Sequence, residues 1–160
     1  MSFKITPSSD LQPCIDIVIA TYCGANYIEE QLVSIQQSKH YQQAIHKVII
    51  VDDASSDETV ALVKQVMQDD NKIVLYQNDG AAKGASKNFE WGISLTTTPY
   101  VMLCDQDDVW FEDKITLSLE ALITRDEHTP LLAFTDVHIV DEQLNLLCTS
   151  YFDLKNIPRT

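Results

Sequence analysis

The sequence predicts an α/β fold built around a mainly parallel sheet. Short runs of aliphatic, β-branched residues alternate with segments whose apolar residues recur every three or four positions. This alternation is typical of parallel strands connected by helices. Polar residues also follow the predicted strands, at the sheet edge where such folds bind ligands. After the fourth strand comes the acidic run Asp105-Gln106-Asp107-Asp108.

Five strands and a hairpin are expected from short apolar runs bounded by turn-forming residues. The predicted strands cover residues 15–20, 47–51, 72–76, 100–104 and 131–135. Asn78-Asp79-Gly80 is predicted to form a turn after the third. Residues 137–140 and 144–149 are expected to pair across a turn at Asp141-Glu142.

Four helices are expected between or after these strands. Asn26 with Glu29, and Ser55 with Glu58, have the spacing of capping signals for the first two helices. The third is predicted over residues 84–95, with Phe89 and Ile93 on one face, and the fourth over 115–123. The inner faces of the first two helices are expected to carry Ile28, Leu32, Ile35, Val60, Val63 and Met67.

The composition fits one globular domain with its own core, because 45% of the 160 residues are hydrophobic. The formal net charge is −13, from 11 basic and 24 acidic residues. Such a surface repels polyanions, so we expect no nucleic-acid partner. An anionic small molecule can still bind through a metal ion or a helix N-terminus.

The four cysteines lie far apart without a C-x-x-C pair, which argues against a zinc site or a disulfide framework and favours reduced cytosolic thiols. Residues 1–13 are polar and contain two prolines, and we interpret them as a flexible leader without the apolar stretch of a signal peptide. No run approaches the roughly 18 apolar residues of a membrane span.

The acidic run is the most informative feature for function. Four carboxylates lie within residues 104–112, directly after an apolar strand. Like charges at this spacing repel one another unless a cation neutralises them, and hard divalent ions prefer oxygen ligands. Acidic residues also favour helix starts, but three Asp in four positions exceed that need. The run therefore predicts a site for a metal ion and a phosphate-bearing ligand.

Other α/β functions lack their motifs in this sequence. No G-x-G-x-x-G follows the first strand, and the chain contains no G-x-x-x-x-G-K-[ST] and no G-x-S-x-G. A phospho-receiver needs acidic residues at the end of the first strand, where Ala20 and Thr21 stand. These absences argue against dinucleotide binding, P-loop chemistry, α/β-hydrolase chemistry and phosphotransfer.

Three segments together resemble the family 2 glycosyltransferases of the GT-A fold: residues 17–22 (IVIATY), 51–59 (VDDASSDET) and 105–108 (DQDD). The resemblance covers about residues 14–150 and implies a Rossmann-like three-layer α/β/α sandwich that binds a nucleotide sugar. The sequence Asp-Gln-Asp-Asp-Val-Trp is similar to that of bacterial rhamnosyltransferase-like members. The implied reaction moves a sugar from a nucleoside diphosphate, such as dTDP-rhamnose or a UDP-sugar, to an acceptor hydroxyl, with inversion, in cell-surface polysaccharide synthesis.

The resemblance also implies roles for the first two strand ends. Asp53 is expected to accept a hydrogen bond from the imide N–H of the base, which only an acceptor can recognise. Its alternative role is to cap the following helix. Tyr22 is expected to pack on the base beside the backbone of Ala20 and Thr21, with an ordinary half-buried aromatic as the alternative.

In the acidic run, the resemblance makes Asp107 the first choice for ligand of a Mg²⁺ or Mn²⁺ ion. Asp105 is expected to bind the ribose or to help hold the ion through water. Asp108 is expected to orient the sugar or to cap the next helix. Trp110 is expected to pack under this loop or to line the sugar pocket.

A basic residue near the start of the third helix is implied to approach the diphosphate, and Lys83 is preferred over Lys87. Asn88 is expected to bond locally to the backbone. Asp136 either faces the substrates or caps the hairpin.

The resemblance places the catalytic base after the donor-binding half, so no catalytic residue is assigned here. We expect the chain to be that half, with residues 151–160 a tail or the start of a missing acceptor region. The expected acceptor is a glycan or a lipid-linked molecule. The protein is expected to lie in the cytoplasm, at the inner face of the membrane. Self-association is expected through exposed apolar surface. Two alternatives stay open: a non-catalytic nucleotide-sugar-binding module and, less favoured because a glycine-rich basic loop is absent, a nucleotidyltransferase.

Overall fold

The computed structural model describes residues 14–79, 84–123 and 130–158. The chain divides into two compact units, Met1–Thr116 and Leu117–Thr160, which are described separately. The predictions for the leader at 1–13, for Gly80 and for Lys83 lie outside the described residues.

The first unit is built on a sheet of four parallel strands in the order β3-β2-β1-β4. The strands are β1 (Ile15–Thr21), β2 (Ile45–Asp52), β3 (Ile73–Gln77) and β4 (Tyr100–Asp105), which confirms the first four predicted strands. The register pairs Thr21 with Asp52 and Ala20 with Asp105. The polar residues that end these strands therefore lie side by side at one edge of the sheet.

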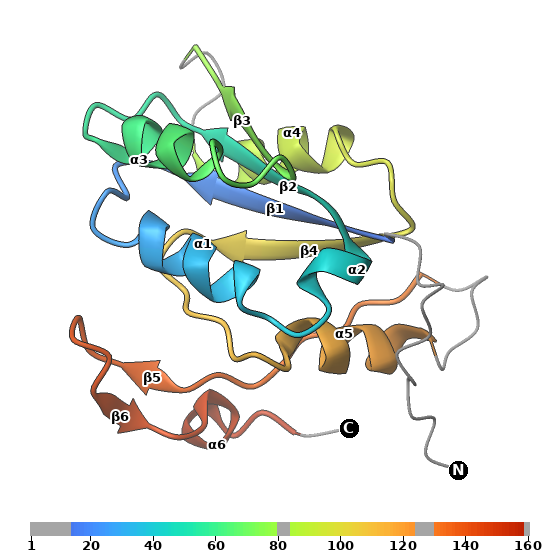
Figure 1. Cartoon of the computed structure of the whole chain (residues 1–160). Coiled ribbons are helices and arrows are strands. Elements are labelled where there is room, and N and C mark those ends of the chain that lie inside the picture. Colours follow the sequence, from blue (N-terminus) through green and yellow to red (C-terminus); the bar gives the residue numbers. More distant parts are fainter. Residues whose placement is uncertain (1–13, 80–83, 124–129, 159–160) are drawn as a thin grey trace. The chain divides into compact units, whose positions relative to one another are not determined.

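Helices cover both faces of this sheet, as the predicted three-layer sandwich requires. Helices α1 (Ile28–Gln36) and α3 (Thr59–Val66) lie on one face, and α4 (Ala85–Ser94) lies on the other (Figure 1). Helix α2 (Tyr41–Ala44), a single short turn before β2, was not predicted. Helix α5 (Lys114–Ile123) confirms the fourth predicted helix. None of the helices in the described part of the chain is both long and apolar enough to cross a membrane.

The packing of α4 separates Phe89 and Ile93, the two residues predicted to share one face of that helix. Ile93 is 43% exposed, whereas Asn88 and Gly92, four positions apart, are buried. A Cβ atom on Gly92 would overlap the Val18 side chain, so glycine permits the close approach of α4 to β1. Phe89, by contrast, is partly buried against Val18, Ile49 and Val51, so the two residues predicted to share a face differ in burial, and small or polar residues share the inner face with apolar ones.

Both predicted capping signals are wrong. The residue before α1 is Tyr27, without a side-chain cap, and the N–H of Ile28 donates to the carbonyl of Gly24. Glu58 precedes α3, also without a side-chain cap. The Asp57 carboxylate accepts the Thr59 N–H at 3.1 Å instead. The expected capping residues lie in loops whose polar groups are used to join the strand ends.

The second unit contains a small antiparallel hairpin, as predicted. Strands β5 (Ile139–Val140) and β6 (Leu146–Cys148) pair across a turn in which Asp141 accepts the N–H groups of Gln143 and Asn145. Helix α6 (Tyr151–Lys155) follows, with the Ser150 side chain as its N-cap.

The predicted fifth strand at residues 131–135 is wrong. These residues have no regular structure, and Leu132 and Phe134 are 86% and 68% exposed. A strand needs a neighbour for its backbone hydrogen bonds, and no strand in the described part of the chain pairs with this segment.

Candidate functional site

A cavity of about 330 Å³ opens at the edge of the sheet formed by the carboxyl ends of the strands. Its walls come from the segments that follow β1, β2 and β4 and from the start of α4. The lining residues are Ala20, Thr21, Tyr22, Asp53, Gly84, Ala85, Asn88, Asp105 and Gln106. Five of them are predicted site residues: Ala20, Thr21, Tyr22, Asp53 and Asp105.

The ends of β1 and β2 are joined by a buried polar contact. The Thr21 hydroxyl donates to the carboxylate of Asp52 at 3.0 Å, and both side chains are buried. Asp52 also accepts the Ser55 N–H at 2.9 Å. The N–H of Asp53 donates to the Thr21 carbonyl at 2.8 Å. This network holds the turn after β2 against β1 and sets the direction in which Asp53 leaves the sheet.

The Asp53 carboxylate is half-buried, and donors among the described residues orient it. Its Oδ1 accepts from the Asn78 amide at 2.8 Å, and its Oδ2 accepts from the Gly84 N–H at 2.7 Å. Gly84 directly precedes α4, so Asp53 contacts the start of α4 and not that of α3, whose first N–H is taken by Asp57. A carboxylate only accepts hydrogen bonds, so Asp53 presents acceptor oxygens in the wall of the cavity.

Asn88 extends this network into the interior. It is buried, and its side-chain oxygen accepts from the Asn78 amide at 2.7 Å, in place of the local backbone contact that was expected. The chain Asp53–Asn78–Asn88 therefore links the floor of the cavity to α4.

Tyr22 forms the outer wall of the cavity. Its side chain is 60% exposed, so the alternative of a half-buried aromatic is not what the structure shows. The residues after it are held by side chains from the turn that follows β2. The N–H of Cys23 donates to the Ser55 hydroxyl at 2.8 Å, and that of Ala25 donates to Asp57 at 3.1 Å. The exposed Tyr22 ring is therefore followed by a backbone segment that hydrogen bonds hold in place.

The acidic turn follows β4, the strand next to β1 in the sheet. Asp105 lines the cavity, while Asp107 and Asp108 are exposed on the adjoining turn and are not among the lining residues. The pKa of the Asp108 carboxyl is raised above its ordinary value, because its surroundings partly exclude water and because Asp105 and Asp107 repel a further negative charge. The turn therefore carries negative charge that a cation would stabilise.

The acidic turn rests on a buried layer. Trp110 is only 8% exposed, and its backbone N–H donates to the Ser34 hydroxyl of α1 at 3.0 Å. The ammonium group of Lys114 lies 5.9 Å from the centre of the Trp110 ring. Burial raises the pKa of the Cys104 thiol and lowers that of Lys114. Trp110 therefore packs beneath the turn, which agrees with one of its two predicted positions.

The donor set fits a hard divalent ion held partly by substrate. In the described part of the chain, no three acidic, histidine or cysteine side chains converge into a cage for a metal. Mg²⁺ and Mn²⁺ do not need such a cage, since they commonly use one or two carboxylates together with phosphate oxygens and water. Exposed Asp105 and Asp107 meet that requirement.

The predicted basic residues contribute little within the described part of the site. Lys83 lies outside the described residues. Lys87 is exposed on α4 and pairs with Glu90 at 2.6 Å, which raises the pKa of its ammonium group. In the second unit, Asp136 accepts from the Ser150 hydroxyl at 2.6 Å and from the Phe152 N–H at 3.0 Å. Asp136 therefore supports the hairpin and the start of α6.

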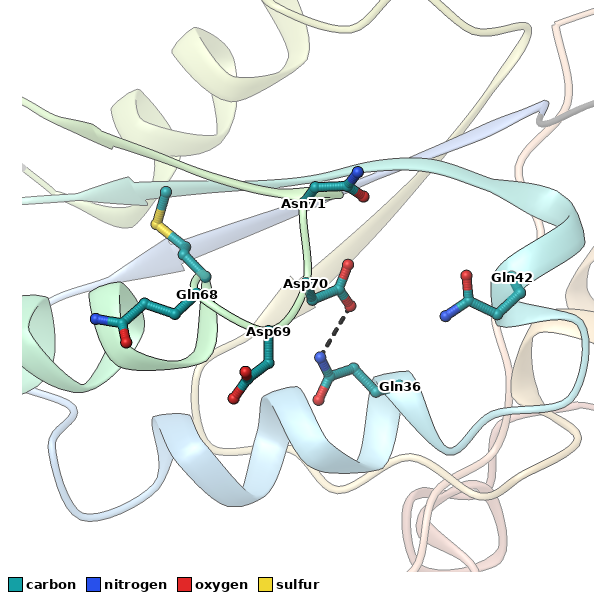
Figure 2. Close-up of a pocket in the computed structure, with 7 residues that line it drawn as sticks. Gln36, Gln42, Gln68, Asp69, Asp70 and Asn71 are labelled. Atoms are coloured by element: carbon teal, nitrogen blue, oxygen red, sulfur yellow. Dashed lines mark hydrogen bonds between the residues drawn. The ribbon is translucent and has the colours of Figure 1, made fainter.

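A second cavity, of about 440 Å³, lies at the amino-end edge of the same sheet (Figure 2). Its lining includes Gln36, Gln42, Asp69, Asp70 and Asn71. Asp70 accepts from Gln36 at 2.8 Å and from the Tyr41 hydroxyl at 2.7 Å. Although burial opposes ionisation, these hydrogen bonds lower the pKa of Asp70. Asp70 is thus used to join α1, α2 and the start of β3, which gives the acidic group in this cavity a structural role.

Two contributors to the site were missed from the sequence. Asp52 and Gln106 belong to the motifs VDDASSDET and DQDD, but the sequence assigns neither of them a role of its own. The signal for Asp52 is its place as the last residue of an apolar strand, where a buried carboxylate needs donors. Gln106 carries no comparable signal, because its partner is 84 positions away.

Comparisons with known proteins agree with this geometry. The family model described as "Glycosyl transferase family 2" matches residues 16–143. The "dTDP-rhamnosyl transferase RfbG" of Shigella flexneri is 33% identical over 109 residues, which are 66% of this chain and 37% of that protein. The "Putative teichuronic acid biosynthesis glycosyltransferase TuaG" of Bacillus subtilis is 32% identical over 117 residues, 71% of this chain and 44% of that protein. The chain thus spans less than half the length of these relatives.

Solved structures share the fold. S. aureus TarS residues 1–349, determined in complex with UDP-GlcNAc, superposes with a TM-score of 0.63 at 20% identity over 69% of this chain and 31% of that one. The mannosyltransferase PcManGT of Pyrobaculum calidifontis, determined with GDP-Man and Mn²⁺, gives 0.61 at 22% identity over 75% of this chain and 35% of that one. The fold is the Rossmann-like GT-A sandwich.

Proposed function

The chain belongs to glycosyl transferase family 2, and from that premise we propose that its cavity binds the nucleoside-diphosphate sugar whose sugar the whole protein transfers to an acceptor hydroxyl. One observation carries the proposal. The cavity brings an oriented hydrogen-bond acceptor, Asp53, an exposed aromatic wall, Tyr22, and an acidic turn, Asp105, to one edge of a parallel sheet. These are the groups that a base, a ribose and a metal-bound diphosphate require.

The base is proposed to be a pyrimidine. Uracil and thymine both carry an imide N–H, and Asp53 is an acceptor whose direction is fixed by Asn78 and Gly84. The Tyr22 ring is proposed to stack on the base, a contact for which it is sufficiently exposed. The relative named as a dTDP-rhamnosyl transferase supports a thymine or uracil nucleotide, and dTDP-rhamnose is our first candidate for the donor.

The acidic turn is proposed to handle the diphosphate and the sugar. Asp107 and Asp105 would hold a Mg²⁺ or Mn²⁺ ion together with the donor phosphates. When bound, such an ion supplies electrostatic stabilisation of the charge that develops on the leaving diphosphate. Asp105 also lies in the cavity wall, within the region proposed for the ribose. Asp108, exposed on the same turn, is proposed to orient the sugar hydroxyls.

The whole protein is proposed to act in cell-surface polysaccharide synthesis, with inversion at the sugar and with a glycan or lipid-linked acceptor. The relative whose name refers to teichuronic acid biosynthesis supports this setting. All four cysteines are free thiols, which is compatible with the proposed cytoplasmic location.

Calorimetric titration tests the proposal directly. The chain is titrated with UDP, dTDP and GDP, each with and without Mn²⁺. We expect UDP and dTDP to bind more tightly than GDP, because a guanine does not offer the pyrimidine imide in the same place. We also expect Mn²⁺ to strengthen binding of both pyrimidine nucleotides. If none of the three nucleotides bound to the chain, the assignment of the cavity would be contradicted.

A further inference from the structure

We propose that Gln106 is a positioning residue that fixes the Tyr22 wall of the cavity to the acidic turn. This inference rests on the proposed function, because the wall matters only if a nucleotide base packs on it. Gln106 itself is not proposed to touch the reacting atoms.

The contact is a two-point pairing between one side chain and one backbone unit. The Gln106 Oε1 accepts from the Tyr22 N–H at 2.9 Å, and the Gln106 Nε2 donates to the Tyr22 carbonyl at 3.2 Å. The parallel ladder between β1 and β4 ends at the pair Ala20–Asp105. The carboxamide of Gln106 therefore takes the place of a further peptide group and carries the pairing beyond the end of the sheet.

Few side chains have the groups for this pairing. A carboxamide supplies one acceptor and a donor on the same planar group, whereas a carboxylate lacks the donor and an aliphatic side chain lacks both. Asparagine has the right groups on a stem that is one methylene shorter. Glutamine is thus matched to its position between Asp105 and Asp107.

The neighbouring Gly24 makes room for the carboxamide. Gly24 is buried, and a Cβ atom there would overlap the Gln106 Oε1 and Cδ atoms. The Gln106 carboxamide therefore occupies space that a side chain at position 24 would fill.

The pairing matters because it holds the Tyr22 peptide unit itself, whereas Ser55 and Asp57 hold the residues that follow it. With 60% of the side chain exposed, its position depends on the backbone from which it projects. Cys23, the next residue, has a φ of 47°, so the chain turns away immediately after Tyr22. Holding Tyr22 in advance reduces the ordering cost when a base packs on it. The pairing also places this wall in register with the carboxylates proposed to hold the ion.

The test compares Gln106→Leu, which keeps the size and removes both hydrogen bonds, with Gln65→Leu on the exposed face of α3 as the matched control. We expect Gln106→Leu to weaken UDP binding in the presence of Mn²⁺ roughly tenfold, as the loss of two hydrogen bonds allows. We also expect faster amide hydrogen exchange in a peptide covering residues 20–26, while the urea unfolding midpoint stays close to that of the wild type. The control should leave affinity and exchange unchanged.

A double-mutant cycle separates this role from a general loss of stability. Gly24→Ala should weaken UDP binding in the wild-type background, because the added methyl displaces the carboxamide. In a Gln106→Ala background the same change should have a much smaller effect, since the group it displaces is gone. Additive effects in this cycle, or unchanged UDP affinity in Gln106→Leu, would overturn the positioning role while the proposed function stands. If the wild type binds no nucleotide, the proposed function fails and the role in affinity fails with it.

Discussion

The carboxylate of Asp53, the residue directly after β2, accepts a hydrogen bond at 2.7 Å from the backbone N–H of Gly84, which directly precedes α4. These residues are 31 positions apart, and they lie on two elements that meet at the same cavity. Gly84 has a φ of 101°, a left-handed conformation that disfavours other residues. The contact therefore fixes both the acceptor proposed to recognise the base and the start of the helix beside it.

Replacing Asp53 by Asn should weaken binding of UDP and dTDP by about tenfold or more, equivalent to about 1.4 kcal/mol. The amide keeps one acceptor, but its NH₂ group meets either the Asn78 amide or the Gly84 N–H, which are both donors. Calorimetric titration of the variant measures the loss. Asp69→Asn at the opposite edge of the sheet is the matched control and should bind like the wild type. Equal affinities for both variants would refute the role of Asp53.

Removing the Asp107 carboxylate should abolish most of the gain in UDP affinity that Mn²⁺ provides, while binding without metal changes little. The reason is that Asp107 is the proposed protein ligand of the ion, and the phosphates supply its other ligands. Titrations of Asp107→Ala with and without Mn²⁺ measure this difference. The proposed metal site is wrong if the effect of Mn²⁺ persists unchanged in this variant.

A methyl group at Gly92 should destabilise the fold, because it would overlap the Val18 side chain and force α4 away from β1. Overpacking of this kind costs about 1–3 kcal/mol. Urea unfolding of Gly92→Ala followed by circular dichroism gives the change in free energy. Ser86→Ala, on the exposed face of the same helix, controls for helix propensity and should be neutral or slightly stabilising. A stable Gly92→Ala variant would show that α4 can shift without loss of packing.

Lowering the pH should reduce the free energy of unfolding, in part through Asp16, a buried residue near the start of β1. Burial opposes its ionisation, but hydrogen bonds from the Thr97 and Thr98 N–H groups and from His46 lower its pKa. A carboxyl whose pKa is lower in the folded state stabilises that state fully above its unfolded pKa, about 3.9, and loses this contribution as the pH falls through the folded value.

The free energy of unfolding of the wild type relative to Asp16→Asn should accordingly shrink as the pH falls below about 4, by an amount on the order of 1 kcal/mol. Urea titrations of both proteins at pH 7, 5, 4 and 3, values bracketing about 3.9, provide the comparison. A difference that stays constant down to the lowest pH would show that Asp16 has an ordinary pKa in the folded protein.

Much of the architecture follows from local patterns. The strands at Ile15–Thr21 and Ile45–Asp52 are nearly uninterrupted β-branched runs, and such runs read as buried strands whatever their neighbours. The predictions were wrong where the structure of a segment depends on contacts with another segment of the chain. Residues 131–135 have strand-like composition but no pairing strand in the described part of the chain, and Ser55 has a capping residue's chemistry but is bound to Asp52 and Cys23.

By itself the sequence determined the four parallel strands with the helices α1, α3, α4 and α5, the polar groups at the strand ends and the family to which the chain belongs, because periodicity and short motifs are local properties. Only the tertiary structure decided how those groups are used. It joined Asp53 to Gly84 and Gln106 to Tyr22, and it turned Gly92 toward β1. Such contacts depend on which side chains packing brings within about 3 Å of one another, and the linear pattern carries no record of that distance.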